Sequence, residues 1–178
     1  MTRFVAFLRG INVGNRIVKK ETLQQVFTSL DFTGISTVRQ SGNILFESNM
    51  DMEMVKLKIE EKLQANLGYE VAVFIRTVEQ LKAILDVDPF KGQLAEGTSF
   101  LVTLIDKPPI ASFTAQLPLL IPKSTAQITS VKGTEFFSLT HGGGEGALPN
   151  TYIESKLKVK ATTRNINVIR EIVEKFGT

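Results

Sequence analysis

The chain has 178 residues, of which 43% are hydrophobic and 22% are charged, and it contains no cysteine. This length allows one domain or two small subdomains with a proper core, and the composition is that of an ordinary soluble globular protein. The absence of cysteine excludes a disulfide framework, a thiolate nucleophile and a cysteine-ligated metal. The apolar runs are too short to cross a bilayer and the first lacks the pattern of a signal peptide, so we expect a cytoplasmic protein with no membrane partner.

The net charge of +3 is too small to indicate nucleic-acid binding by itself, but the basic residues are unevenly distributed. Two stretches, 1–20 and 155–170, each hold five basic side chains and no acid, whereas the region between them has an excess of acids. If the two stretches meet in space, they form one basic patch on an otherwise acidic body. The alternative is that these charges are simply solvated.

Hydrophobic periodicity predicts seven elements in the first half of the chain. An apolar run before Gly10 predicts a buried strand, and Ser41-Gly42 between two strand-like runs predicts a tight hairpin. Asn49 is expected to cap a helix that ends at Gly68, and Thr77 is expected to cap a short helix. The order is strand, helix, strand, strand, helix, strand, helix, over residues 3–8, 19–30, 35–40, 43–48, the segment between 49 and 68, 71–76 and 78–86.

The second half repeats this order after a boundary predicted at 88–98, where proline and glycine cluster. The expected elements are a strand at 99–105, a helix from 108 to 117, a hairpin of 127–131 and 135–140, a helix at 150–157, an extended piece at 161–163 and a last helix capped by Asn165. Each half has the strand and helix order of a ferredoxin-like unit. We therefore predict an α+β fold of two tandem ferredoxin-like (βαββαβ) units, 1–90 and 91–178, each followed by a helix.

Three segments together are distinctive: residues 7–14 (FLRGINVG), 40–43 (QSGN) and 162–165 (TTRN). With these segments the chain resembles, over essentially its full length, the bacterial family called domain of unknown function sixteen-ninety-seven (DUF1697). The chain departs from the family pattern at Asn15, where a second glycine is typical, and at Ile166, where an aromatic residue is typical. The resemblance implies the fold, and it brings no established activity with it.

The RGINVG segment is the first candidate for chemistry. Gly10 and Gly14 can adopt positive φ, so the backbone can turn back and present its N–H groups to an anion at the start of a helix. Four basic residues surround the turn and no acid precedes Glu21: Arg9, Arg16, Lys19 and Lys20. An ordinary strand-to-helix turn that needs glycine for steric reasons explains the segment equally well.

Ferredoxin-like geometry predicts that Arg9 and Asn43 are separated, because it places the QSGN hairpin away from the end of the first strand. The same geometry predicts a cluster at the hairpin end, composed of Arg39, Ser41, Asn43 and Arg76, with Lys132 and Arg164 at comparable places in the second half. Arginine suits bidentate recognition of phosphate or carboxylate. The alternatives are that Arg39 and Arg76 pair with surface acids, and that Asn43 serves only the turn.

Other motifs are incomplete. His141-Gly142-Gly143-Gly144 is similar to an esterase oxyanion segment, but there is no Gly-x-Ser-x-Gly elbow, so a flexible glycine loop that can close over a ligand is the better interpretation. The glycine spacings match neither the dinucleotide fingerprint nor the Walker loop. No metal site or pair of glycosidase carboxylates can be identified, and a sheet apolar on both sides does not favour RNA binding by exposed aromatics.

Two hypotheses follow. The first is a non-enzymatic binding module for a phosphate-bearing small molecule or nucleic acid, without a cofactor or metal, that uses Arg9, Gly10, Asn12, Gly14, Ser41, Asn43, Arg164 and Asn165. The second is an enzyme acting on a small anionic substrate, with Arg164 holding the anion and Ser41 or His141 transferring a proton. A structural or partner-binding role is also compatible with the sequence.

Overall fold

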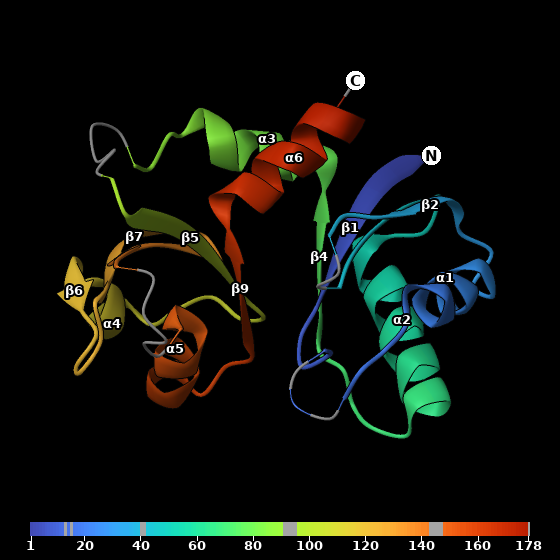
Figure 1. Cartoon of the computed structure of the whole chain (residues 1–178), viewed down its shortest axis with the longest axis horizontal. Helices are drawn as coiled ribbons and strands as arrows, with labels where there is room; N and C mark the ends of the chain where they lie inside the picture. Colours follow the sequence, from blue (N-terminus) through green and yellow to red (C-terminus); the bar gives the residue numbers. More distant parts are fainter. Residues whose placement is uncertain (13, 15, 40–41, 91–95, 143–147, 178) are drawn as a thin grey trace. The chain divides into compact units, whose positions relative to one another are not determined.

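The computed structural model describes residues 1–12, 14, 16–39, 42–90, 96–142 and 148–177, and these form a mixed α+β fold with two antiparallel sheets (Figure 1). The strands are β1 Thr2–Leu8, β2 Thr33–Thr37, β3 Asn43–Ser48, β4 Val73–Thr77, β5 Thr98–Ile105, β6 Leu119–Leu120, β7 Ala126–Lys132, β8 Glu135–His141 and β9 Ala161–Asn165. The helices are α1 Lys20–Thr28, α2 Met52–Leu67, α3 Val78–Asp86, α4 Ala111–Thr114, α5 Pro149–Leu157 and α6 Ile166–Phe176.

The chain divides into two compact units, Met1–Ala83 with Glu171–Thr178, and Ile84–Arg170. Both divisions fall inside helices, so α3 begins in the first unit and ends in the second, while α6 begins in the second and ends in the first. Residues 91–95 of the boundary predicted from the sequence lie outside the described residues.

The predicted elements are largely confirmed, although several of their bounds differ by two or three residues. The α2 helix ends at Gly68, whose φ is 77°, and the Thr77 hydroxyl accepts the Gln80 N–H at the start of α3, at 3.1 Å. The predicted cap Asn49 is wrong, because the Asp51 carboxylate, directly before the helix, accepts the Met54 N–H at 2.9 Å.

Two further details differ from the prediction in the second half. The helix expected from residue 108 to 117 is confined to Ala111–Thr114, and the short strand β6 was not expected. Pro108 and Pro109 precede the helix and Pro118 follows it, and proline is not tolerated in a helix interior, so the helical stretch is short.

In the first unit, the strand order is β2-β3-β1-β4 and every neighbouring pair is antiparallel. Helices α1 and α2 cover one face, and Figure 1 shows both on the same side of the sheet. Phe46 lies at the centre of this core: its ring is 4.6 Å from that of Phe32, 5.3 Å from Phe27 and 5.7 Å from Phe4, centroid to centroid. Stacked and edge-on aromatic pairs of this kind stabilise a core beyond their buried area.

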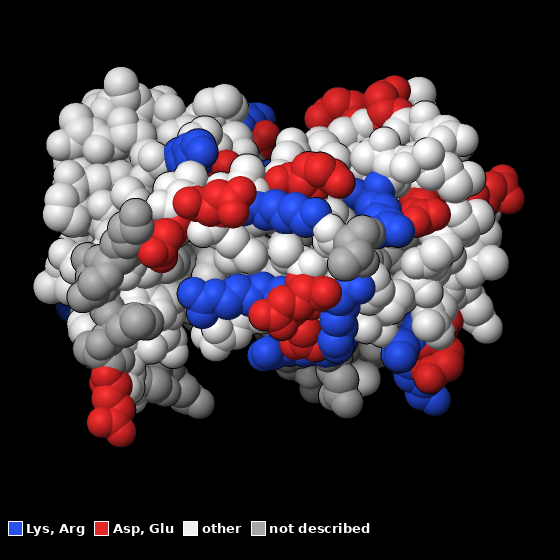
Figure 2. All heavy atoms as spheres, turned by 90° about the horizontal axis from the view of Figure 1, so that it is seen from above, with Lys and Arg blue, Asp and Glu red and all other residues white. Residues whose placement is uncertain are grey.

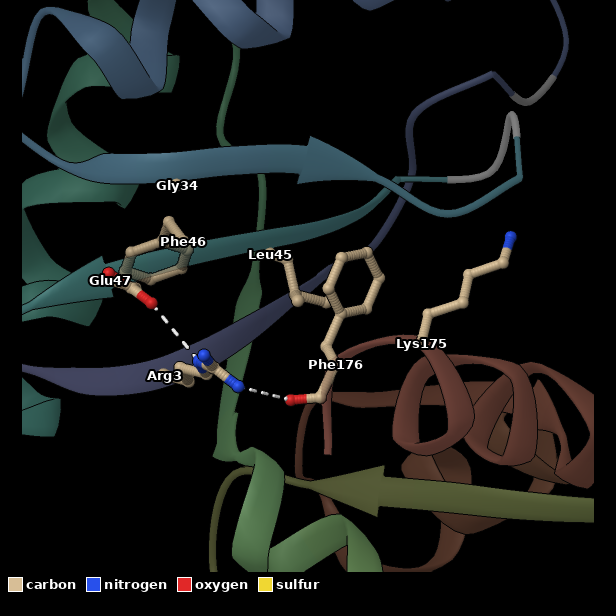
Figure 3. Close-up of a pocket in the computed structure, with 7 residues that line it drawn as sticks. All are labelled: Arg3, Gly34, Leu45, Phe46, Glu47, Lys175 and Phe176. Carbon is tan, nitrogen blue, oxygen red and sulfur yellow. Dashed lines mark hydrogen bonds and ion pairs between the residues drawn. The ribbon is translucent and has the colours of Figure 1, made fainter. Parts of the chain in front are cut away.

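The opposite face of this sheet receives the last turns of α6, which belong to the same unit. Arg3 and Leu45 alternate with the core residues Phe4 and Phe46 along their strands, so they face away from α1 and α2. The Arg3 guanidinium donates to the Phe176 carbonyl at 2.9 Å and pairs with Glu47 at 3.2 Å, as Figure 3 shows. These contacts fix the end of α6 against β1 and β3.

In the second unit, the strand order is β6-β7-β8-β5-β9, again antiparallel throughout. Helices α4 and α5 supply Phe113 and Ile153 to a core that includes Phe136 of β8. The rings of Phe113 and Phe136 meet edge to face with centroids 5.8 Å apart. Without the added edge strand β6, the order β7-β8-β5-β9 is that of the first sheet.

Candidate functional site

The loop between β1 and α1 contains three described residues with a left-handed backbone. Gly10, Asn12 and Gly14 have φ values of 75°, 54° and 59°. A Cβ added to either glycine would meet nothing within 4 Å. The glycines are therefore suited to the backbone conformation rather than to a tight approach by another group, and the predicted positive φ is confirmed.

Asn12 holds this loop closed. Its backbone N–H donates to the Arg16 carbonyl at 2.8 Å, and its side-chain Oδ1 accepts the Val18 N–H at 2.8 Å. Asparagine tolerates positive φ and can form such local bonds, which explains its presence at a left-handed position. Asn12 is thus a positioning residue for the segment that carries Arg16.

The QSGN hairpin lies beside this loop, and our expectation that Arg9 and Asn43 are separated is wrong. Asn43 pairs with Phe7, and the Leu8 N–H donates to the Gly42 carbonyl at 2.8 Å. A Cβ on Gly42, where φ is 72°, would lie 2.6 Å from Ile11 Cδ1. Because β1 and β3 are antiparallel neighbours, the end of one lies beside the start of the other.

Asn43 serves the hairpin that it begins. Its side chain is completely buried and its Nδ2 donates to the Val38 carbonyl at 3.0 Å, while the Val38 N–H donates to the Asn43 carbonyl at 3.0 Å. The interpretation of Asn43 as a turn residue is therefore supported. Ser41, the other predicted site residue in this hairpin, lies outside the described residues.

Arg9 and Arg16 approach the segment that follows α2. The Arg9 N–H donates to the Ala72 carbonyl at 2.9 Å, and the Arg16 Cζ lies 4.6 Å from the centroid of the Tyr69 ring. Lys19, at the N-cap of α1, makes no side-chain capping bond, and Glu21 lies in the first turn. The loop therefore has basic side chains and an aromatic ring at one end of the first sheet. Sequence reasoning missed Tyr69, for which no motif gives a signal.

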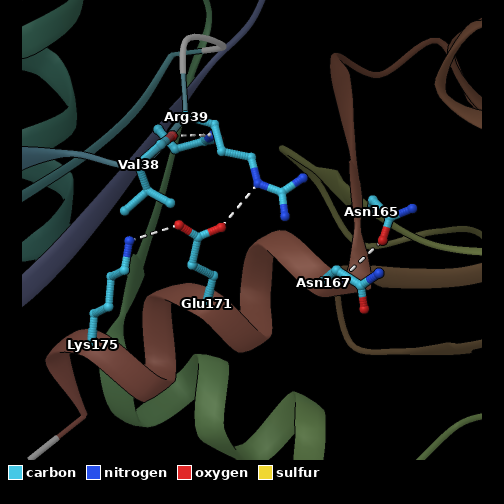
Figure 4. Close-up of polar contacts among 7 residues, drawn as sticks. Val38, Arg39, Asn165, Asn167, Glu171 and Lys175 are labelled. Carbon is cyan, nitrogen blue, oxygen red and sulfur yellow. Dashed lines mark hydrogen bonds and ion pairs between the residues drawn. The ribbon is translucent and has the colours of Figure 1, made fainter.

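Arg39 is engaged at the hairpin, as the surface-pair alternative predicted. Its guanidinium binds the Glu171 carboxylate at 2.9 Å, and Lys175 binds the same carboxylate at 2.8 Å (Figure 4). Hydrogen bonds from Lys175 and Arg39 lower the pKa of Glu171. Such an arrangement neutralises charge at this corner and fixes α6.

The predicted cluster of Arg76 with the hairpin residues is wrong. Arg76 pairs with Val5, which itself pairs with Leu45, whereas Asn43 shares a row with Phe7 and Phe74. The end of β4 lies beside the start of β1, away from the hairpin, because the two strands are antiparallel.

Arg164 and Asn165 belong to the second unit, at the end of β9. The Arg164 Nη1 donates to the Thr162 hydroxyl at 2.8 Å and to the Thr163 carbonyl at 2.9 Å. Burial lowers the pKa of the Arg164 guanidinium to about 10, so the group stays charged at neutral pH. The Asn165 Oδ1 accepts the Asn167 N–H at 2.9 Å, as Figure 4 also shows, which confirms the predicted cap of α6.

Two of the residues named for the enzyme hypothesis, His141 and Arg164, do not share a site, and the third, Ser41, lies outside the described residues. His141 is exposed at the end of β8, where its Nδ1 lies 3.0 Å from the Thr98 hydroxyl. Arg164 pairs with Val102, four residues further along β5 and on its other side. Strand geometry then separates His141 from Arg164 by about 16 Å. Gly143 and Gly144 of the glycine loop lie outside the described residues.

A small pocket of about 160 Å³ opens in the first unit between β1, β3 and the end of α6 (Figure 3). Its lining residues are Arg3, Gly34, Leu45, Phe46, Glu47, Lys175 and Phe176. The charged groups there already bind within the chain, Arg3 to Glu47 and the Phe176 carbonyl, and Lys175 to Glu171. We therefore interpret the pocket as a result of the packing of α6 against β1 and β3 rather than as a ligand site.

The charges in Figure 2 are interspersed: on the face drawn there, lysine and arginine side chains alternate with acidic ones. Within the described ranges, no three histidine, aspartate or glutamate side chains are grouped so as to hold a metal ion. None of the helices in those ranges is long and apolar enough to cross a membrane.

Comparison with known proteins identifies a structure of the same fold and the family of the chain. A structure described as that of the conserved bacterial protein SP0830 from Streptococcus pneumoniae matches 100% of this chain and 99% of its own, with a TM-score of 0.71 and 21% identity. At this identity the likeness shows the shared fold alone. No curated protein matches the chain. The model of the family described as "Protein of unknown function (DUF1697)" matches residues 1–137, and the chain therefore belongs to the DUF1697 family.

Proposed function

We propose that this protein is a non-enzymatic binding module for a phosphate-bearing ligand, and that the β1–α1 loop is its recognition element. The observation that carries the proposal is the left-handed conformation of Gly10, Asn12 and Gly14 in a loop whose neighbouring side chains are basic. Left-handed residues turn a loop back on itself, and turns of this kind form concave surfaces that bind anions. Phosphate is the anion that arginine side chains beside such a turn match best.

The charges around the loop support the same ligand class. Arg9 is half-buried at the end of β1, and Arg16, Lys19 and Lys20 are exposed beyond it. Neighbouring cations lower the cost of bringing a doubly charged phosphate to the loop, and they speed its approach at low salt. Gly42 of the QSGN segment lies close against Ile11, which helps to hold the loop in place.

The experiment is a calorimetric titration of inorganic pyrophosphate at low and moderate salt. We expect Arg9→Ala and Arg16→Ala each to weaken binding several-fold and to flatten its salt dependence. Lys107→Ala, which removes an exposed charge of the second unit, is the matched control and leaves binding unchanged. Arg164→Ala tests separately whether the second unit contributes. Pyrophosphate binding that is identical in wild type, Arg9→Ala and Arg16→Ala would end the proposal.

The two units are, we propose, ferredoxin-like repeats related by duplication. Supporting this, Val5 faces Arg76 across β1 and β4, and Val102 faces Arg164 across β5 and β9. Each arginine donates from Nη1 to the carbonyl of the residue before it, at 2.7 Å for Arg76 and 2.9 Å for Arg164. The residue after each arginine caps the next helix. Backbone superposition of the two units tests the repeat.

A further inference from the structure

The Arg16–Tyr69 pair narrows the ligand class. The guanidinium carbon lies 4.6 Å from the ring centroid, within the range of a cation–π contact. Tyr69 is half-buried and packs against the core of the first unit, so its ring is held in place. Arg16 itself is exposed, which leaves the side of the guanidinium that faces away from the ring open to a ligand.

The position of Arg16 is set by the same loop. The Asn12 N–H donates to the Arg16 carbonyl and the Asn12 Oδ1 accepts the Val18 N–H, so Asn12 holds the backbone at and after Arg16 close to the left-handed residues. A planar cation backed by an aromatic ring matches the face of a nucleobase.

Resting on the proposed function, we infer that the phosphate-bearing ligand is a mononucleotide, whose phosphates lie at the β1–α1 loop and whose base stacks on Arg16. A sugar phosphate or inorganic phosphate has no planar group for this surface. A long nucleic acid needs a continuous basic track, whereas the net charge of the chain is only +3.

The second tyrosine of the chain provides a matched control for the Arg16–Tyr69 pair. It has two tyrosines and no tryptophan, so tyrosine fluorescence reports on these two rings alone. The second ring, Tyr152, has the Lys156 ammonium 5.6 Å from its centroid. Lysine is a point charge without a plane, so this second pair cannot stack a base in the same way.

The test compares ADP with pyrophosphate in calorimetric titrations of the full chain. ADP is expected to bind about tenfold more tightly than pyrophosphate, since stacking of one base accounts for a difference of that order. Arg16→Lys keeps the positive charge and removes the planar guanidinium. The affinity for ADP should therefore fall to that for pyrophosphate, while the affinity for pyrophosphate should change by about twofold or less. Lys156→Ala should leave both affinities unchanged. Thermal unfolding by circular dichroism verifies that each variant is folded.

Fluorescence gives a second readout. In Tyr152→Phe, where Tyr69 is the remaining tyrosine, ADP should change the emission and pyrophosphate should not; in Tyr69→Phe, ADP should leave the emission constant. Equal affinities for ADP and pyrophosphate in the wild type would overturn the inference and leave the proposed function standing. If neither ADP nor pyrophosphate binds, both the inference and the proposed function are wrong. If a short single-stranded oligonucleotide binds far more tightly than ADP, with steep salt dependence, the inference that the ligand is a mononucleotide is wrong.

Discussion

The two units place very different side chains at the same point of the sheet. Phe46 of β3 pairs with Phe4, and Ser138 of β8 pairs with Leu101; Phe4 and Leu101 each precede a valine, Val5 or Val102, that pairs with an arginine. In the first unit this point is the centre of four packed phenylalanine rings. In the second unit it carries a hydroxyl that is buried and has no hydrogen-bond partner among the described residues. The difference teaches that two sheets with the same strand order can carry a packed aromatic ring or a buried hydroxyl next to the corresponding strand.

The largest effect should come from the aromatic centre. Phe46→Ala removes a ring that is 1% exposed, and we expect the free energy of unfolding to fall by about 4 kcal/mol through lost burial and the cavity left behind. Urea denaturation monitored by circular dichroism measures it. A loss below about 1 kcal/mol would mean that the three neighbouring rings close the gap and that the centre is not essential.

The hairpin turns of the two units provide the next comparison. Gly42 and Gly133 both have positive φ, but a Cβ would meet Ile11 at 2.6 Å at the first and only Glu135 Oε2 at 3.5 Å at the second. Gly42→Ala combines backbone strain with overpacking and should cost about 3 kcal/mol. Gly133→Ala should cost about 1 kcal/mol, from strain alone. Equal losses in urea denaturation would contradict the close contact between the two motif loops.

A smaller effect of opposite sign is expected at Ser138. Ser138→Ala removes a buried hydroxyl without a described partner, so the free energy of unfolding should rise by about 1 kcal/mol. Thermal unfolding of the variant beside the wild type measures the change. A decrease instead would indicate that the hydroxyl is bonded, for example to a buried water, and that the contrast with Phe46 is one of packing only.

The smallest effect concerns Glu171. Its pKa is lowered by hydrogen bonds from Lys175 and Arg39, so its stabilisation is present above the ordinary carboxyl pKa and is lost as the pH falls through the lowered value. Glu171→Gln should therefore lower the midpoint of thermal unfolding at about pH 7, and the difference should vanish in strong acid. Glu174→Gln, on the same helix and exposed, is the control and should have no comparable effect. If the difference in unfolding midpoint between wild type and Glu171→Gln persists in acid, the effect comes from packing rather than from the charge of Glu171.

Local patterns were enough to predict most of the fold. The apolar run before Gly10, the helix that stops at Gly68 and the caps at Thr77 and Asn165 depend on neighbours within a few residues, and all are confirmed. Periodicity and capping are short-range signals, so a single sequence carries them. The Asn49 cap failed only because Asp51, two residues later, is a competing acceptor.

The candidate site was harder to predict because its contacts are long-range. The contact between the RGINVG and QSGN segments follows from strand direction and register. The prediction misjudged both, so it separated Arg9 from Asn43 and placed Arg76 at the wrong end of the sheet. Arg39 and Glu171 are 132 residues apart, and Arg16 and Tyr69 belong to different loops. No local pattern marks such pairs.

The path of α6 has a consequence for how the protein is made. The first unit consists of Met1–Ala83 and Glu171–Thr178, so its last segment leaves the ribosome after the whole of the second unit. Arg3, Arg39 and Lys82 bind this late segment at Phe176, Glu171 and Gly177. The first unit to be translated is therefore the last to be completed. During synthesis, the side of its sheet that carries Arg3 and Leu45 stays uncovered until the last turns of α6, a helix that begins in the second unit, have been made.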